Sequence, residues 1–182
     1  MKILSIATGT LLGAAFLFAA QPAHAQQLPE PLVLAVNQAE AGGMALALAV
    51  GQDQLAGAEE ELTARAKVTD ACDLKYKAYK VLEQDRPVFY LLAQPPTPGS
   101  IVFGRHYRIA GDSVSPSTKS CFVSPPNPPG AVGAFSTHLL SEAPSEFHVF
   151  LSLVQDTTIY VGTSYGAWQV VKGKVSLLQR RQ

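Results

Sequence analysis

The stretch QDRPVFYLLA (residues 84–93) separates two halves of the chain that differ in local structure. Pro87 disfavours helical geometry at Arg86, so a helix that approaches from the N-terminal side is expected to end there. Val88–Ala93 is rich in apolar, β-branched and aromatic residues, which favours a strand. We therefore predict an α+β fold, in which N-terminal helices are followed by a mostly antiparallel sheet.

The half before this stretch, from Pro31 to about Gln84, is expected to be mostly helical. Pro31 suits the first turn of a helix. The apolar residues on one face of this helix are Leu32, Val36 and Ala39. We expect Gly42-Gly43 to interrupt it. A second helix is predicted from the acidic run 59–61, and a third over 74–82, where apolar residues recur at helical spacing.

The half after residue 93 contains segments typical of strands. Including the first, the predicted strands are Val88–Ala93, Ile101–Ile109, Ala131–His138, Thr158–Gly162, Ala167–Val171 and Lys174–Leu178. Gly173 favours a tight hairpin between the last two. The proline-rich segments 94–99 and 124–130 are predicted to be stiff spacers between strands, with binding to proline-recognising modules as the alternative.

The first 25 residues have the three parts of a cleavable signal peptide. Lys2 supplies the positive charge, Ile3–Ala20 the apolar region, and Ala23-His24-Ala25 the small residues that signal peptidase accepts. A membrane anchor is the alternative, since residues 3–20 are almost long enough to span a bilayer. We predict cleavage after residue 25, which leaves a single domain, residues 26–182, in the periplasm or outside the cell.

Charge and hydropathy narrow the classes of partner. The sequence holds 14 basic and 14 acidic residues, so we expect no nucleic-acid partner, which would require a basic excess. We recognise no second long apolar segment and therefore predict no stable membrane anchor after signal cleavage. A protein partner of unknown identity remains as the expectation.

The sequence contains two cysteines, Cys72 and Cys121. An even number of cysteines in an oxidising compartment indicates a disulfide. The alternative is a catalytic thiol at Cys72, which follows residues that favour a helix start, with His138 or His148 as the base. We predict the disulfide.

Residues 162–166, GTSYG, match the G-x-S-x-G motif of serine hydrolases. In those enzymes the serine lies where a strand turns sharply into a helix. Here residues 168–171 are predicted to continue as a strand, and no His, Asp or Glu follows Ser164. The usual order of the catalytic triad is excluded, so we predict a hairpin turn.

Two short motifs contain the histidines with the clearest chemical meaning. Ser136-Thr137-His138 is followed by Ser145-Glu146-Phe147-His148. The pattern resembles the core of the JAMM (JAB/MPN) metallopeptidases, whose signature is His-Ser/Thr-His followed several residues later by Ser-x-x-Asp. Two histidines at i and i+2 on a strand point the same way and can share one zinc ion. The resemblance further implies an Asp ligand on a following helix, and an upstream Glu as base on the zinc-bound water.

The sequence departs from that signature in four respects. Ser136 occupies the first ligand position, His148 occupies the Asp position, and no Glu lies within residues 88–109. The gap before Ser145 is also one residue shorter than in the commonest pattern. Either the chain is a metal-free descendant of that fold or the match is fortuitous. The resemblance also requires a helix at 147–154, where the apolar residues fit a helix and a strand equally.

A rebuilt zinc site is a third interpretation. Its residues would be His138, His148 and His106 as ligands, with Glu146 or Glu142 as the base. Three histidines are a sufficient set of zinc ligands if they converge.

We therefore expect an exported, non-catalytic α+β module that binds a protein, of the inhibitor or immunity type, and that needs no cofactor. The alternative is a zinc-dependent, peptidase-like hydrolase that uses the rebuilt histidine site. Convergence of the three histidines would favour the enzyme, whereas scattered histidines and a large exposed apolar patch would favour the binding module.

Overall fold

The computed structural model describes residues 27–181, and the signal peptide predicted over 1–25 lies outside the described residues. The helices of this part are α1 (Glu30–Gly51), α2 (Ala58–Ala66) and α3 (Glu146–Val154). Its strands are β1 (Tyr76–Glu83), β2 (Arg86–Ala93), β3 (Ile101–Gly104), β4 (Tyr107–Ala110), β5 (Ser113–Pro116), β6 (Phe122–Ser124), β7 (Ala134–Thr137), β8 (Ile159–Gly162), β9 (Gly166–Val171) and β10 (Lys174–Arg180). The predicted α+β class is confirmed.

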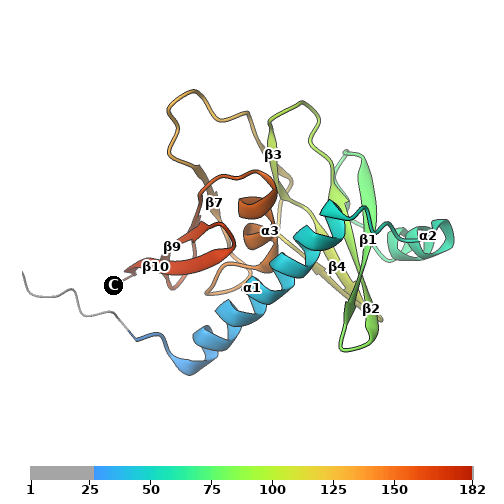
Figure 1. The fold of residues 1–182 in the computed structure, drawn as a ribbon, viewed down its shortest axis with the longest axis horizontal. Helices are drawn as coiled ribbons and strands as arrows, with labels where there is room; N and C mark the ends of the chain where they lie inside the picture. The colour runs from blue at the N-terminus through green and yellow to red at the C-terminus, as the bar shows by residue number, and fades with distance from the viewer. Residues whose placement is uncertain (1–26, 182) are drawn as a thin grey trace, which may run out of the picture.

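Two four-stranded sheets form the body of the fold (Figure 1). The first has the order β1-β2-β4-β5 and is antiparallel throughout. The second has the order β10-β9-β8-β7, and its β7 and β8 are parallel. α3 connects these two parallel strands and lies with α1 between the sheets, while β3 and β6 form a small separate pair (Figure 1).

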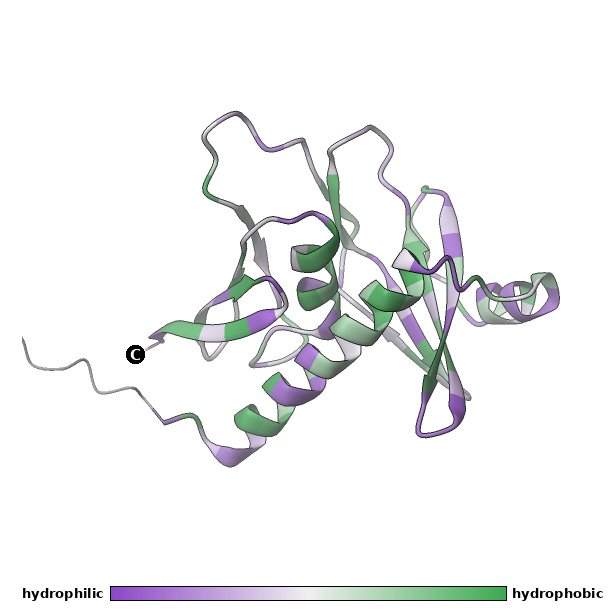
Figure 2. Cartoon of the chain, viewed as in Figure 1, coloured by the Kyte–Doolittle hydropathy of each residue, from purple (hydrophilic) through white to green (hydrophobic). Residues whose placement is uncertain are grey.

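Apolar residues from both helices and both sheets form the main core. Its most buried members include Leu46, Tyr90, Val149, Ile159 and Trp168. Figure 2 shows apolar residues concentrated on α3, whereas α2, at the outer end of the first sheet, is mostly polar. A second, smaller core lies around Ala64, Leu91 and Ile109. Each large side chain buried in this way contributes roughly 1.5–3 kcal/mol to stability.

The prediction that Gly42-Gly43 would interrupt the first helix is wrong, because α1 continues through both residues. The glycines instead allow α1 to approach α3 closely. A Cβ atom on Gly43 would lie 2.4 Å from the Cβ of Val149. The cost of glycine inside a helix, about 1 kcal/mol per residue, is offset by the packing that this close approach permits.

The expectation that no second long apolar segment exists is also wrong. By length and composition, Glu30–Gly51 could cross a membrane. In this fold, however, one face of α1 is part of the core through Leu32, Val36 and Leu46, as a core helix of a globular domain would be. Leu34 and Leu48 on its other face are exposed.

The helix predicted over 74–82 is a strand, β1, and this prediction is wrong. The segment pairs with β2 along its whole length, from Tyr76 opposite Ala93 to Glu83 opposite Arg86. Gln84-Asp85 forms the two-residue turn between the strands, and both residues have positive φ. The stretch that was expected to end a helix therefore closes a β-hairpin, because cross-strand pairing outweighs a spacing that also fits a helix.

The single strand predicted over Ile101–Ile109 is divided into β3, which pairs with β6, and β4, which pairs with β2. The chain changes direction after Gly104. A Cβ atom on Gly104 would lie 1.8 Å from the side-chain oxygen of Thr118, so the division requires glycine there. The Cys72–Cys121 disulfide, with an S–S distance of 2.00 Å, lies beside this division and is confirmed.

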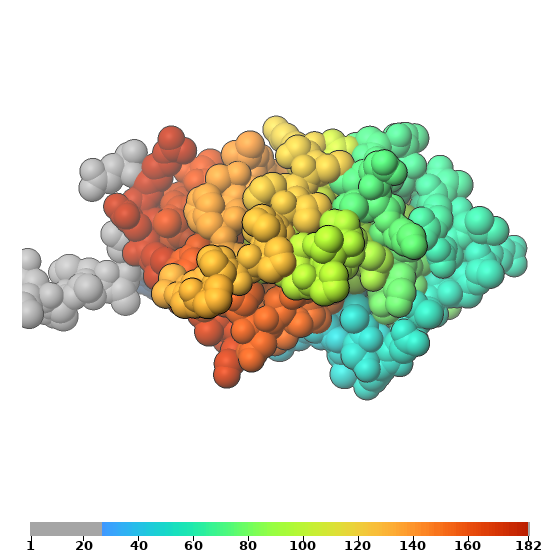
Figure 3. All heavy atoms as spheres, turned by 90° about the horizontal axis from the view of Figure 1, so that it is seen from above, coloured from blue at the N-terminus to red at the C-terminus, as the bar shows by residue number. Residues whose placement is uncertain are grey.

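The remaining predictions agree with the structure apart from the ends of the elements. β7 is shorter than the expected Ala131–His138, and β9 and β10 form the expected hairpin around Gly173, which has φ of +80°. Residues 147–154 belong to a helix, α3, so the strand alternative is wrong. The two proline-rich segments lie between strands and touch where Gly99 meets Pro126, on the face seen in Figure 3.

Candidate functional site

A groove of about 800 Å³ lies between α1 and the segment 138–147. The small residues that line it on the α1 side are Ala35, Ala39, Gly42 and Ala45. Opposite them lie His138, the loop that follows β7, and the first turn of α3. Its volume is in the range of pockets that bind small ligands or single side chains. It is larger than the hollow of about 450 Å³ that lies beside α2.

One wall of the groove carries a charged cluster from the first sheet. Glu83 accepts a hydrogen bond from the hydroxyl of Tyr90 at 3.1 Å, and it forms an ion pair with Arg108. Tyr90 and Arg108 face each other across β2 and β4. Burial raises the pKa of Tyr90, and the nearby carboxylates of Glu146 and Glu83 raise it further. This tyrosine is therefore a hydrogen-bond donor rather than an anion.

Of the two residues expected as bases, Glu146 lies in the groove. It occupies the first turn of α3 beneath α1, and a Cβ atom on Gly42 would lie 3.2 Å from the Cβ of Glu146. Burial raises the pKa of its carboxyl group. Glu142, in contrast, is exposed, and its backbone carbonyl accepts a hydrogen bond from Thr163 at 2.9 Å.

His138 and His148 lie together, as the interpretation of a rebuilt zinc site would require of these two residues. Their ring centroids are 5.0 Å apart with an interplanar angle of 78°, and each residue is 2 % exposed. The Nδ1 atom of His148 accepts a hydrogen bond from the backbone N–H of Ser145 at 3.1 Å, which leaves the proton of the neutral ring on Nε2. The Nδ1 atom of His138 is buried without a hydrogen-bond partner. Burial lowers the pKa of both rings, that of His148 to about 3, so the pair is neutral at pH 7.

His106 does not offer a free nitrogen to this pair. Its Nδ1 accepts the backbone N–H of Ala93 at 3.1 Å, and its Nε2 donates to the carbonyl of Val102 at 2.7 Å. Its ring stacks on Phe147 with centroids 5.6 Å apart. Burial lowers its pKa to about 4. Between residues 27 and 181 no group of three or more His, Cys, Asp or Glu side chains is arranged to hold a metal ion.

The GTSYG segment is a turn between β8 and β9, as predicted, and it does not lead into a helix. Thr163 organises this turn. Its hydroxyl donates to the carbonyl of Glu142 and accepts hydrogen bonds from Gly166 N–H and from the indole of Trp168, the latter at 2.9 Å. Ser164 points to solvent. The motif therefore has a structural explanation that involves threonine rather than serine.

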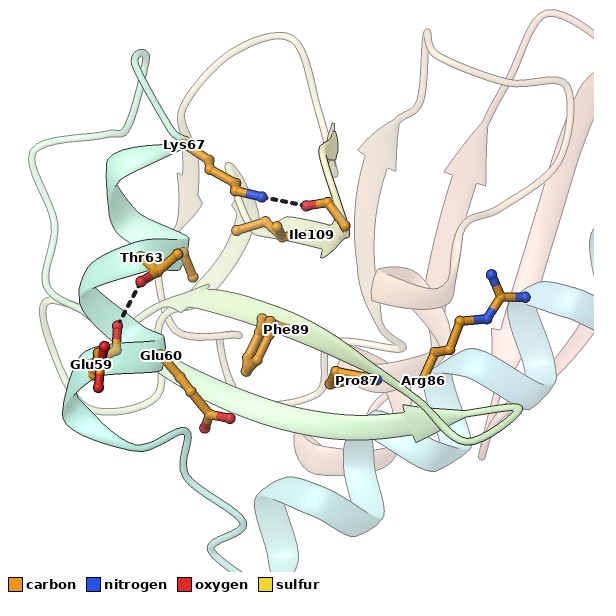
Figure 4. Close-up of a pocket in the computed structure, with 10 residues that line it drawn as sticks. Glu59, Glu60, Thr63, Lys67, Arg86, Pro87, Phe89 and Ile109 are labelled. Atoms are coloured by element: carbon orange, nitrogen blue, oxygen red, sulfur yellow. Dashed lines mark hydrogen bonds between the residues drawn. The ribbon is translucent and has the colours of Figure 1, made fainter.

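A second hollow of about 450 Å³ lies between α2 and the first sheet (Figure 4). Phe89 and Ile109 form its apolar floor. Two of its rim charges are paired: Glu60 binds Lys80 at 2.6 Å, and Lys67 binds Asp112 at 3.0 Å and the backbone of Gly111. Glu59 and Arg86 also line the cleft. The groove is larger and lies beside the histidine pair, so it is the better candidate.

Sequence reasoning missed three residues of the groove, Glu83, Tyr90 and Arg108. They converge only because β1, β2 and β4 are neighbours in one sheet. Residues 76–81 give no clear signal for the strand, because Ala78 and Tyr79 are both buried and the apolar residues of 74–82 also fit a helical spacing.

Comparisons with known proteins add no guide to function. No protein-family model, curated protein or solved structure matches this chain. A proposed function therefore depends on the groove and on the buried histidines.

Proposed function

We propose that this protein is an exported, non-catalytic binding module whose groove receives a segment of another polypeptide. One observation carries the proposal: the groove is open, while the described residues around it do not make up a complete set of metal ligands or a paired base and nucleophile. Glu83 is held by Tyr90 and Arg108, and both nitrogens of His106 are used within the fold. A general base or a metal ligand needs a free lone pair aimed at the reacting group.

The surroundings of the groove support a protein partner. Leu140 lines the groove and is 42 % exposed, and its neighbour Leu139 is 70 % exposed. Exposed leucines beside a concave site are typical of surfaces that bind proteins. The neutral charge of the chain and its disulfide agree with a stable module in an oxidising compartment, such as an inhibitor or an immunity-type protein.

The topology is compatible with a degenerate JAMM-like domain. β7 leads through the segment with Ser145 into α3 and then into the parallel strand β8, and α3 is the helix that the resemblance requires. Ser136 and His148, which stand where that family has a histidine and an aspartate, both lie in the interior. The scaffold without its usual ligands supports a binding role in place of the original chemistry.

Site-specific photo-cross-linking in the native host tests this proposal. With p-benzoylphenylalanine in place of Leu140, we expect a covalent adduct with one discrete polypeptide. The matched control is the same replacement at Leu62, an exposed leucine on α2, which is expected to give no such adduct. Identical adducts at both positions, or none at either, would overturn the proposal.

A zinc hydrolase is the second candidate, because His138 and His148 lie together and Nδ1 of His138 lacks a partner. The residues do not supply a third protein ligand, since His106 is fully hydrogen-bonded, so they fit a zinc site only in part. Metal analysis of protein purified without chelator separates the two candidates. Near-stoichiometric zinc that is lost in His138→Ala would favour the hydrolase. Our proposal expects far less than one zinc per chain, with no difference between the two proteins.

A further inference from the structure

The groove presents a hydrogen-bond acceptor that lacks a donor. The carboxylate of Glu146 lines the groove and, within the described residues, receives no hydrogen bond from another residue. His138 also lines the groove, and its Nδ1 atom is buried without a hydrogen-bond partner. Burial lowers the pKa of this ring, so it adds no positive charge that would compensate the carboxylate.

The positive charge of the groove is already engaged. Arg108 is the cation that lines it, and this guanidinium is paired with Glu83. The hydroxyl of Tyr90 also donates to Glu83. With two carboxylates and one guanidinium, the groove has an excess of negative charge, located at Glu146. A ligand that brings a positive charge and several N–H donors would complement it.

We infer that the polypeptide segment received by the groove inserts a basic side chain, lysine or arginine, toward Glu146. This inference rests on the proposed function and names the chemistry of the partner. An ammonium group has three donors and a guanidinium five, which suits a carboxylate that has no hydrogen bond from another residue. A carboxylate would be repelled by Glu146, and a neutral amide would leave its charge compensated only by Arg108, which is itself paired with Glu83.

The shape of the groove also suits a long basic side chain. The α1 wall is formed by small residues such as Ala39 and Gly42, and the rings of Tyr90 and Phe147 line the interior. Lysine and arginine bury their aliphatic stems against apolar surface while the charged end finds polar partners. The same wall would leave a short side chain loosely packed.

Binding of three blocked tripeptides to isotope-labelled protein, followed by NMR, tests the inference. The probes are Ac-Ala-Arg-Ala-NH₂, its glutamine analogue and its glutamate analogue. We expect the arginine peptide to shift the amide signals of Gly42 and of residues 138–147 in a saturable way. Its affinity should be about tenfold or more above that of the glutamine peptide, as a charge-assisted hydrogen bond implies. The glutamate peptide should not bind.

Two variants locate the effect. Glu146→Gln removes the charge with little change of shape and should reduce the affinity for the arginine peptide to that of the glutamine peptide. Glu59→Gln removes the same charge at the α2 cleft and should change nothing. Unshifted amide signals outside the groove would show that the variants are folded.

The outcomes separate this inference from the proposed function. Equal affinity of the arginine and glutamine peptides at the groove would overturn the basic preference while leaving a polypeptide-binding groove. An arginine peptide that does not shift the groove signals, or that binds Glu146→Gln unchanged, would also overturn the inference. The cross-linking result at Leu140 decides the proposed function independently.

Discussion

His106 and His138 are buried to the same extent, 2 % exposed, but their surroundings differ. His106 lies against the first sheet, where Ala93 and Val102 satisfy both of its nitrogens. His138 lies at the edge of the groove with one nitrogen unpaired. Buried polar groups are almost always hydrogen-bonded, so the unpaired nitrogen sets His138 apart. Burial alone therefore does not distinguish a histidine whose hydrogen bonds are completed within the fold from one with a nitrogen left unpaired.

The largest expected effect is the loss of folding stability in acid, which acts on the buried histidines of both regions. The pKa of His106 is lowered to about 4 and that of His148 to about 3, mainly by burial, so the folded state binds fewer protons than the unfolded state below pH 6.5. The contribution of the two neutral histidines to the free energy of unfolding is therefore complete above pH 6.5, and it is lost as the pH falls toward these pKa values. Each histidine contributes a slope of up to about 1.4 kcal/mol per pH unit.

Urea unfolding at intervals between pH 7 and pH 5 measures this slope. The control is His106→Leu, whose slope between pH 6 and pH 5 should be smaller by about 1.4 kcal/mol per unit. A flat stability profile over this range would contradict the assignment of neutral buried histidines.

Leucine at position 106 should itself destabilise the fold by about 3 kcal/mol at pH 7, because the N–H of Ala93 and the carbonyl of Val102 are left buried without partners. The matched variant is His138→Leu. It removes a ring whose Nδ1 makes no hydrogen bond, so the free energy of unfolding should change by less than about 1 kcal/mol. Equal losses in the two variants, measured by urea unfolding, would remove the distinction between the two histidines.

Some features of the two histidine regions could be predicted from the sequence, and others could not. The meeting of His138 and His148 follows from local order, since a strand, a short loop and a helix start bring residues ten apart together. The disulfide followed from the number of cysteines, and the strands 158–162 and 167–178 followed from their composition.

The partners of His106 could not be predicted, because they depend on the division of one apolar run at Gly104. That division is imposed by the close approach of Thr118, a long-range contact with no local signal. Glu83 was missed for a similar reason. The spacing of residues 74–82 fits a helix as well as a strand, and pairing with β2 decided between them.

A substitution at Ser145, beside the pair His138 and His148, is expected to have a smaller effect on stability than the one at His106. The hydroxyl of Ser145 lies 3.0 Å from Nδ1 of His148, which also accepts the backbone N–H of Ser145. Ser145→Ala should therefore cost about 1 kcal/mol, since one of two hydrogen bonds remains. Ser164→Ala, an exposed serine in the GTSYG turn, is the control and should have no measurable effect on thermal unfolding. If Ser145→Ala lowered the free energy of unfolding by 3 kcal/mol or more, the hydrogen bonds of the histidine pair would be as important for stability as those of His106.

The smallest expected effect is a gain in stability, from the substitution of Glu146. Burial raises the pKa of Glu146, so its ionised form is less favourable in the folded protein than in the unfolded chain. The contribution of this carboxyl to stability is complete at low pH and is lost as the pH rises through its folded pKa. Glu146→Gln should consequently stabilise the protein by about 0.5 kcal/mol at pH 7 and have no stabilising effect at pH 4.

Thermal unfolding of both proteins at the two pH values measures this difference, with Glu59→Gln on the exposed face of α2 as a control that should show none. A gain at pH 7 would mean that Glu146 is retained at a cost to the fold, as expected of a residue kept for a partner and not for packing. A loss at pH 7 would place Glu146 with His106, among the groups whose interactions are completed inside the chain.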